Sequence, residues 1–160
     1  MNWHDICAHP SLRDLPFKLE TDHWGHIVMS PASNRHSWLQ SQIQALLRAR
    51  GQGGYPVVEC SVETPAGVKV ADVAWASLAF LRRHGTVNPY PEAPEIVVEV
   101  LSPSNSLAEL EQKRALYFAG GAREVWLCDA DGAMRFHALR RVLERSGLVP
   151  AFPDRIELAF

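Results

Sequence analysis

The sequence predicts a single α/β (α+β) domain, and three patterns support this fold class. An aliphatic run at 95–101 indicates a buried strand, and a capped helix follows it at 106–119. A second amphipathic helix is predicted at 35–50, and strand patterns fill much of the remaining chain. The length of 160 residues fits one domain with a substantial core. We therefore expect one domain over 1–160, with 1–15 as an N-terminal arm.

The first third of the chain predicts an arm, a hairpin and a long helix. Short strands at 17–19 and 26–29 are separated by the polar, glycine-containing turn 20–25. From about Arg35, apolar residues recur at steps of three and four, and Gly51 stands where a C-terminal cap is expected. The apolar positions expected to pack on a sheet are Trp38, Leu39, Ile43, Leu46 and Leu47.

The rest of the chain predicts mostly strands. Alternation, proline and turn residues indicate, in order, a strand at 56–62, a turn at 63–67, a strand at 69–76, a helical turn at 77–83 and a loop at 84–94. Beyond the capped helix, a hairpin over 123–129 and 134–139 turns at Asp131-Gly132. The tail that follows fits one more edge strand.

Composition and charge exclude several classes of protein. The chain is 47% hydrophobic and 21% charged, and no apolar run approaches the roughly 20 residues that span a bilayer. The N-terminal sequence lacks a signal-peptide pattern, so we expect a cytosolic protein without a membrane partner. Cys7, Cys60 and Cys128 form no close pair, which argues against a disulfide framework or a zinc knuckle.

The formal net charge of −2 means that a nucleic-acid surface, if present, must be local. Three groups of basic residues are candidates for such a surface, although each is also compatible with an ordinary solvated face. These groups are Arg82-Arg83-His84, Arg140-Arg141 with Arg145, and Arg35 with Arg48 and Arg50.

Two carboxylates stand where apolar residues are expected. Glu99 interrupts the aliphatic run Ile96–Leu101, and Asp72 shares a strand face with small apolar residues. Buried carboxylates are costly unless they are paired or hold a metal. A hard divalent cation such as Mg²⁺ or Mn²⁺ relieves their repulsion, and it activates water for phosphodiester hydrolysis. Lys113 lies on the core side of helix 106–119 and is placed to stabilise the transition-state charge.

Three segments carry a resemblance to a known family. They are KLETDHWGHIVMSPASNRHSWL, ADVAWAS and PEIVVEVLSPSNSLAELEQKRALYFAGGAREVWLCD. Over about residues 16–160 the chain resembles the Uma family of restriction endonucleases, part of the PD-(D/E)XK nuclease superfamily. The resemblance implies a restriction-endonuclease-like mixed β-sheet flanked by α-helices, a metal site at the end of the sheet, and DNA as the substrate. Many nucleases of this kind act as dimers, so we expect a homodimer.

The resemblance also assigns roles to residues. Asp72 matches the aspartate of the motif and Glu99 its second acidic residue, and both would hold the metal. The lysine two residues after that acid is replaced by Leu101, so Lys113 becomes the candidate migrated lysine. Position 71 is Ala where the family usually has Pro, and position 95 is Glu where Asp is common.

Three further residues are candidates for supporting roles. Glu59 would be a third carboxylate, although strand alternation places it on a polar, solvated face. His36 matches a histidine that the family tends to place at the start of its first long helix, where it would contact a phosphate, orient a ligand or serve structure alone. Ser102, with Asn105, would hydrogen-bond Glu99 or a phosphate, or serve only the turn.

The sequence offers little support for other kinds of site. The seven histidines fit no common zinc spacing, and neither G-x-S-x-G nor a phosphate-binding loop occurs. The main alternative keeps the fold without catalysis. In that reading Asp72 pairs with Lys69 or an arginine, Glu99 pairs with Lys113, and the domain binds nucleic acid or protein.

Overall fold

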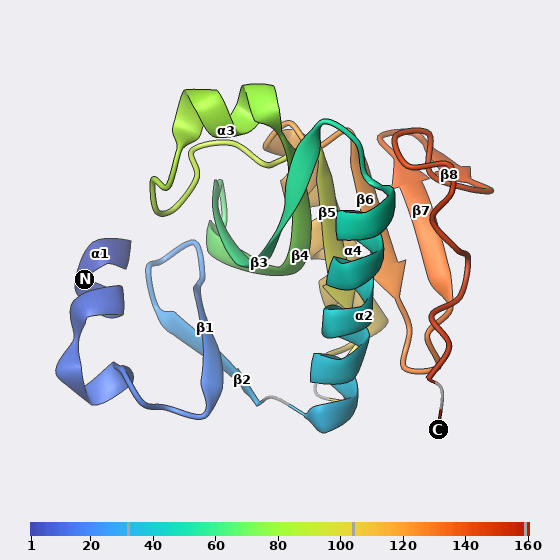
Figure 1. Ribbon diagram of the computed structural model, residues 1–160. Coiled ribbons are helices and arrows are strands. Elements are labelled where there is room, and N and C mark those ends of the chain that lie inside the picture. Colours follow the sequence, from blue (N-terminus) through green and yellow to red (C-terminus); the bar gives the residue numbers. More distant parts are fainter. Residues whose placement is uncertain (32, 104, 159) are drawn as a thin grey trace.

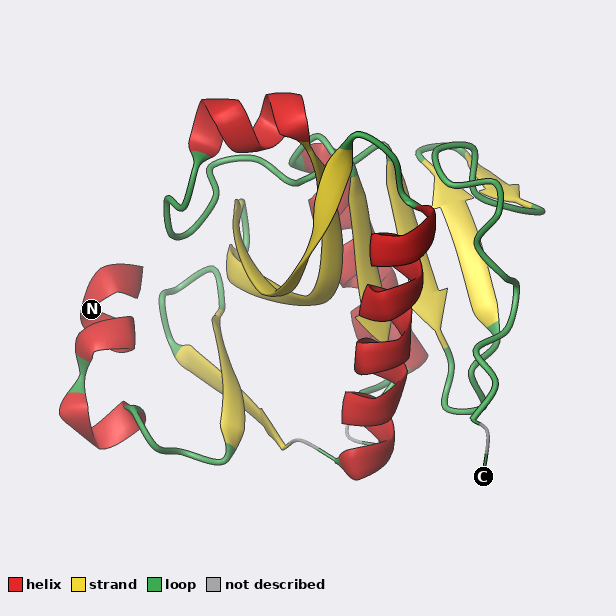
Figure 2. Ribbon diagram, viewed as in Figure 1, coloured by secondary structure: helices red, strands yellow, loops and turns green. Residues whose placement is uncertain are grey.

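A six-stranded mixed sheet covered by helices forms the body of the protein in a computed structural model, which describes residues 1–31, 33–103, 105–158 and 160 (Figures 1 and 2). Its strand order is β3-β4-β5-β6-β7-β8, and only β5 and β6 run parallel. The elements are α1 (Trp3–Ala8), the 3₁₀ turn η1 (Pro10–Leu12), β1 (Phe17–Thr21), β2 (Ile27–Pro31), α2 (Asn34–Arg50), β3 (Gly54–Thr64), β4 (Gly67–Ser77), α3 (Leu78–His84), β5 (Ile96–Val100), α4 (Leu107–Ala119), β6 (Glu124–Cys128), β7 (Met134–Ala138) and β8 (Arg141–Leu143). The predicted mixed sheet flanked by helices is confirmed.

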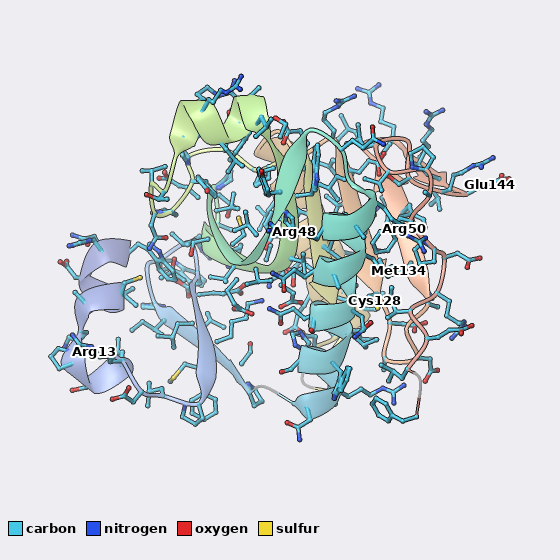
Figure 3. The ribbon with its side chains drawn as sticks, viewed as in Figure 1. Arg13, Arg48, Arg50, Cys128, Met134 and Glu144 are labelled. Carbon is cyan, nitrogen blue, oxygen red and sulfur yellow. The ribbon has the colours of Figure 1, made fainter. Side chains whose placement is uncertain are left out.

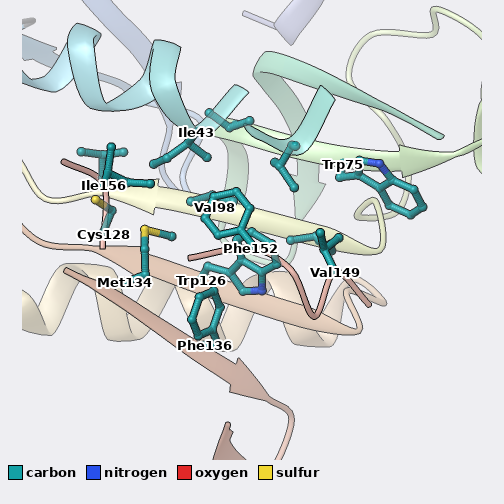
Figure 4. Close-up of a cluster of buried hydrophobic side chains, with 14 of the residues drawn as sticks. Ile43, Trp75, Val98, Trp126, Cys128, Met134, Phe136, Val149, Phe152 and Ile156 are labelled. Atoms are coloured by element: carbon teal, nitrogen blue, oxygen red, sulfur yellow. The ribbon is translucent and has the colours of Figure 1, made fainter. Parts of the chain in front are cut away.

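Each face of the sheet has its own apolar layer. Strand residues that point to one face, such as Val73 and Val98, pack with α2 and the C-terminal segment (Figure 4). Strand residues that point to the opposite face, such as Ala74 and Val97, pack with α3 and α4. Asp72 is two residues from Ala74 and Glu99 is two residues from Val97, so both carboxylates lie on the face that α4 covers. The central strands are buried on both sides, which is typical where helices cover a sheet.

β1 and β2 form a separate two-stranded sheet. Among the described residues, β5 pairs with Val73–Trp75 of β4, and no strand pairs with the earlier half of β4 on that side. There the backbone amides of β4 are taken by hairpin side chains: Val68 N donates to Thr21 Oγ1 (2.7 Å) and Val70 N to Glu20 Oε1 (2.9 Å). The hairpin is therefore attached to the sheet through side chains.

Two local predictions were wrong. Glu20 was assigned to a turn, but β1 extends to Thr21 because the side chains of Glu20 and Thr21 bind β4. The sequence pattern places Trp38 on the packed face of α2, but its side chain is 47% exposed. The buried positions Leu39, Ile43 and Leu47 follow an exact four-residue step, and Trp38 lies about 100° around the helix from Leu39.

Candidate active site

Asp72 lies where β4 and β5 diverge. One of its oxygens, Oδ2, accepts a hydrogen bond from the backbone amide of Val100 (2.7 Å) and lies 3.1 Å from His36 Nε2. The other oxygen, Oδ1, is 2.5 Å from Lys18 Nζ. Burial raises the pKa of Asp72, but the charge of Lys18 and the contact with His36 outweigh burial and hold this pKa well below its ordinary value. Asp72 is therefore a buried, fully ionised carboxylate.

Glu99 lies three residues into β5 and is almost completely buried. The hydroxyl of Tyr117 donates to Glu99 Oε1 (2.6 Å), and Lys113 Nζ lies 3.2 and 3.3 Å from the two carboxylate oxygens. Burial raises the pKa of Glu99, although Lys113 and Lys18 oppose this shift. Glu99 consequently gains a proton more readily than Asp72 does.

Lys113 reaches the site from α4. The helix begins with a capping box in which Ser106 and Glu109 satisfy each other's backbone amides. Lys113 lies about two turns after Ser106. Its Nζ bridges Glu99 and Glu20, and it is 2.6 Å from Glu20 Oε1. Burial lowers the pKa of Lys113, but the two carboxylates outweigh burial, and the pKa lies above its ordinary value. The lysine therefore stays charged.

Sequence reasoning missed Lys18 and Glu20. The β1–β2 hairpin inserts both side chains into the site, where Lys18 contacts Asp72 and Glu20 contacts Lys113. Lys69, the predicted partner of Asp72, instead donates to the backbone carbonyl of Thr21 (2.7 Å). One signal was present in the sequence: Lys18 and Glu20 are two residues apart in a strand, so they share a face. Their partners depend on tertiary docking of the hairpin.

The predicted supporting residues surround the same site. Glu59 is exposed, accepts a hydrogen bond from Gln40 Nε2 (2.9 Å), and has a positive φ of 49°, which is rare for glutamate. His36 lies in the first turn of α2, behind the N-cap Ser33. Ser102 Oγ donates to Asn105 Oδ1 (2.6 Å) in the turn between β5 and α4.

Most of the site side chains line one cavity of about 90 Å³. Its described lining consists of Lys18, Ser30, Pro31, His36, Ser37, Gln40, Glu59, Asp72, Glu99, Ser102, Asn105 and Lys113. A second cavity of about 320 Å³ adjoins it through Ser30, Asn105 and Lys113. The two together form a polar depression between the hairpin, α4 and the β4–β5 fork. This depression is the candidate active site.

The donor set suits a hard divalent cation with few protein ligands. Mg²⁺ commonly takes one or two carboxylates and completes its octahedron with water and phosphate oxygens. Asp72 and Glu99 are two such carboxylates on one cavity wall. Within the described ranges, no three His, Cys, Asp or Glu side chains form a metal-binding group. A cation held here would therefore draw its other ligands from water and substrate.

Comparisons with known proteins define the class of this protein. A crystal structure from Anabaena variabilis, described as "a putative nuclease belonging to DUF820", superposes with a TM-score of 0.67 over 77% of this chain and 73% of that chain, at 18% identity. The shared architecture is that of a restriction-endonuclease-like nuclease. The chain belongs to the Uma2 family, described as "Putative restriction endonuclease", whose pattern matches residues 10–157. A search of curated proteins found no match.

The family match confirms the resemblance drawn from the three sequence segments and supports a nuclease function. In the described part of the chain, no helix has the length and apolar character needed to cross a bilayer.

Proposed function

We propose that this protein hydrolyses phosphodiester bonds in DNA with the aid of Mg²⁺ or Mn²⁺. Asp72 and Glu99 would hold the cation, which when bound supplies a Lewis acid and an activated water. Lys113 would place its charge beside the phosphate undergoing attack. One observation carries the proposal: Lys113 Nζ, from α4, lies 3.2 Å from the Glu99 carboxylate in the cavity that Asp72 also lines.

The surrounding residues support distinct roles. Tyr117 and the Val100 amide fix the orientations of the two carboxylates through hydrogen bonds of 2.6 and 2.7 Å. Glu20 keeps Lys113 charged and directed into the site. His36 contacts Asp72 and presents a second cationic group when it is protonated. Such preorganised charges cost little reorganisation during the reaction.

The test is cleavage of supercoiled plasmid DNA with Mg²⁺, with Mn²⁺ or with EDTA. We expect cleavage only with a divalent cation, and a loss on the order of 10² to 10³ in rate for Asp72→Asn and for Lys113→Met. Lys69→Met is the matched control, because Lys69 lines only the adjoining cavity. Circular dichroism verifies that each variant is folded. Cleavage that survives in EDTA, or in folded Asp72→Asn, would overturn the proposal.

A second candidate function rests on the ion pairs themselves. Lys18 already neutralises Asp72, and Glu20 already neutralises part of Lys113. In a catalytically silent domain, this network would be structural and the protein would only bind nucleic acid or protein. Calorimetry separates the two: the silent domain takes up no Mn²⁺, and its DNA affinity is unchanged in Asp72→Asn. A homodimer and a cytosolic location remain predictions.

A further inference from the structure

We propose that Arg123, Arg141 and Arg145 form a second phosphate-binding site, which takes the DNA backbone away from the bond that is cut. The three residues line a cavity of about 270 Å³ bounded by β8, the start of β6 and the loop 144–148. In Figure 1, β8 lies at the upper right, away from the β1–β2 hairpin at the lower left.

The three arginines have no carboxylate partner among the described residues. Glu124 is the one acidic residue in the described cavity lining, and its oxygens are occupied elsewhere. Its Oε1 accepts from the amides of Gly147 (2.8 Å) and Leu148 (3.0 Å). Its Oε2 accepts from Ser146 Oγ (2.7 Å) and Trp126 Nε1 (2.8 Å). Three positive charges therefore surround this cavity against the single negative charge of Glu124.

The same hydrogen bonds hold the cavity wall in place. Four donors converge on the buried Glu124 carboxylate, and three of them come from consecutive residues of the loop that carries Arg145. Gly147 permits this approach, because an added Cβ would lie only 3.3 Å from Glu124 Oε1. The backbone next to Arg145 is thus fixed before any ligand binds, which lowers the entropic cost of binding.

Most residues of the other two basic groups in the sequence are already engaged. Arg35 and Arg50 donate to the backbone carbonyls of Ala130 and Ala151. Arg83 pairs with Glu92 (2.6 Å), and Arg48 lies over the ring of Tyr55. By contrast, Arg123, Arg141 and Arg145 line one cavity, and none of them has an ion pair within the described part of the chain. Unpaired like charges repel one another, and a bound anion removes that repulsion.

The chemistry of the cavity favours a phosphodiester. Guanidinium groups bind phosphate oxygens in a bidentate manner, and a row of them suits a chain of phosphates better than a single carboxylate. In the sheet, Ile96 pairs with Glu124 and Glu99 pairs with Leu127. At about 3.3 Å per residue, Glu124 and Leu127 are roughly 10 Å apart along β6, and residues three apart in a strand point to opposite faces of the sheet, so the arginine site lies away from Glu99. The bound phosphates are therefore distinct from the one that is cleaved.

The test measures binding of a fluorescein-labelled DNA duplex by anisotropy in EDTA, over a series of NaCl concentrations. Each lost phosphate contact lowers the slope of log affinity against log salt by about 0.9. We expect Arg145→Gln to reduce the slope by about 0.9, and the triple glutamine variant of Arg123, Arg141 and Arg145 by about 2.7. Arg13→Gln is the control, because Arg13 is exposed, has no ion pair with any residue that the structure describes, and lies across the molecule from Glu144 (Figure 3).

The proposal stands if the arginine variants lose affinity and slope while Arg13→Gln matches the wild type. It is overturned if the folded triple variant binds the duplex with wild-type affinity and slope. The inference assumes a DNA substrate and so rests on the proposed function, but the two fail separately. Arginine-dependent binding without metal-dependent cleavage would refute only the nuclease chemistry. Cleavage that depends on Asp72, with binding indifferent to the arginines, would refute only this site.

Discussion

Lys18 occupies the position from which a cation would neutralise Asp72, so removing it should strengthen metal binding. Lys18 Nζ lies 2.5 Å from Asp72 Oδ1, and their side chains are 17% and 1% exposed. A metal ion that coordinates Asp72 must first displace this ammonium group. Lys18→Met keeps most of the apolar stem and deletes the charge.

The size of the effect follows from the geometry. At an effective dielectric constant of about 20, unit charges 2.5 Å apart attract by roughly 7 kcal/mol. Dehydration of the two ions offsets several kcal/mol of this attraction, which leaves about 3 kcal/mol for the metal to overcome. Because each 1.4 kcal/mol is a factor of ten, Lys18→Met should bind Mn²⁺ on the order of 100-fold more tightly than the wild type.

Two measurements check this prediction. Isothermal titration calorimetry with Mn²⁺ gives the affinities directly. Thermal unfolding gives an independent reading, since a ligand stabilises the fold in proportion to the logarithm of its concentration over its dissociation constant. Without metal, Lys18→Met should be less stable than the wild type by about 3 kcal/mol, because Asp72 is left buried with an unpaired charge. Added Mn²⁺ should restore much of that loss.

Lys69→Met provides the matched control. Lys69 contacts the carbonyl of Thr21 and not Asp72, so its removal should leave Mn²⁺ affinity nearly unchanged. If folded Lys18→Met bound Mn²⁺ no more tightly than Lys69→Met, the reasoning that Lys18 and the metal compete for one carboxylate would be refuted.

Three further predictions concern stability. Glu124→Gln replaces one buried acceptor oxygen with an amide group, so urea unfolding should show a loss of about 3 kcal/mol, whereas exposed Glu144→Gln should change little. The hydrogen bond to Asp72 raises the pKa of His36 above 6.5 despite burial, so the unfolding free energy should fall as pH rises from 6.5 through the raised pKa. His36→Gln should flatten that dependence, and an unchanged profile would contradict the assignment. Glu59→Gly relieves a positive φ of 49° and should raise the denaturation midpoint, with Glu59→Ala as the comparison that should not.

Much of the fold could be predicted from local patterns. The capping box at Ser106 and Glu109 and the Asp131-Gly132 turn placed α4 and the β6–β7 hairpin correctly, because each depends on residues close in sequence. Asp72 and Glu99 were found as charges inside apolar strands, and Lys113 by its helical face. The structure brings Lys113 and Glu99 into contact as the sequence suggested.

The partners of these charges could not be predicted in the same way. The contact between Lys18 and Asp72 joins residues 54 positions apart, and that between Glu20 and Lys113 joins residues 93 apart. Both depend on how the hairpin docks beside β4, where side chains replace a neighbouring strand. The local sequence pattern predicts the pairing of β1 with β2. It carries no information on where this hairpin docks on the larger sheet.

The attachment of the hairpin also bears on the solubility of the protein. By capping the Val68 and Val70 amides, Thr21 and Glu20 shield a sheet edge that would otherwise be open to pairing with another chain. The same hairpin covers the carboxylates of the candidate site. Any movement that admits a large substrate by lifting the hairpin therefore also uncovers a β-edge, so access to the site and resistance to aggregation are set by the same few contacts.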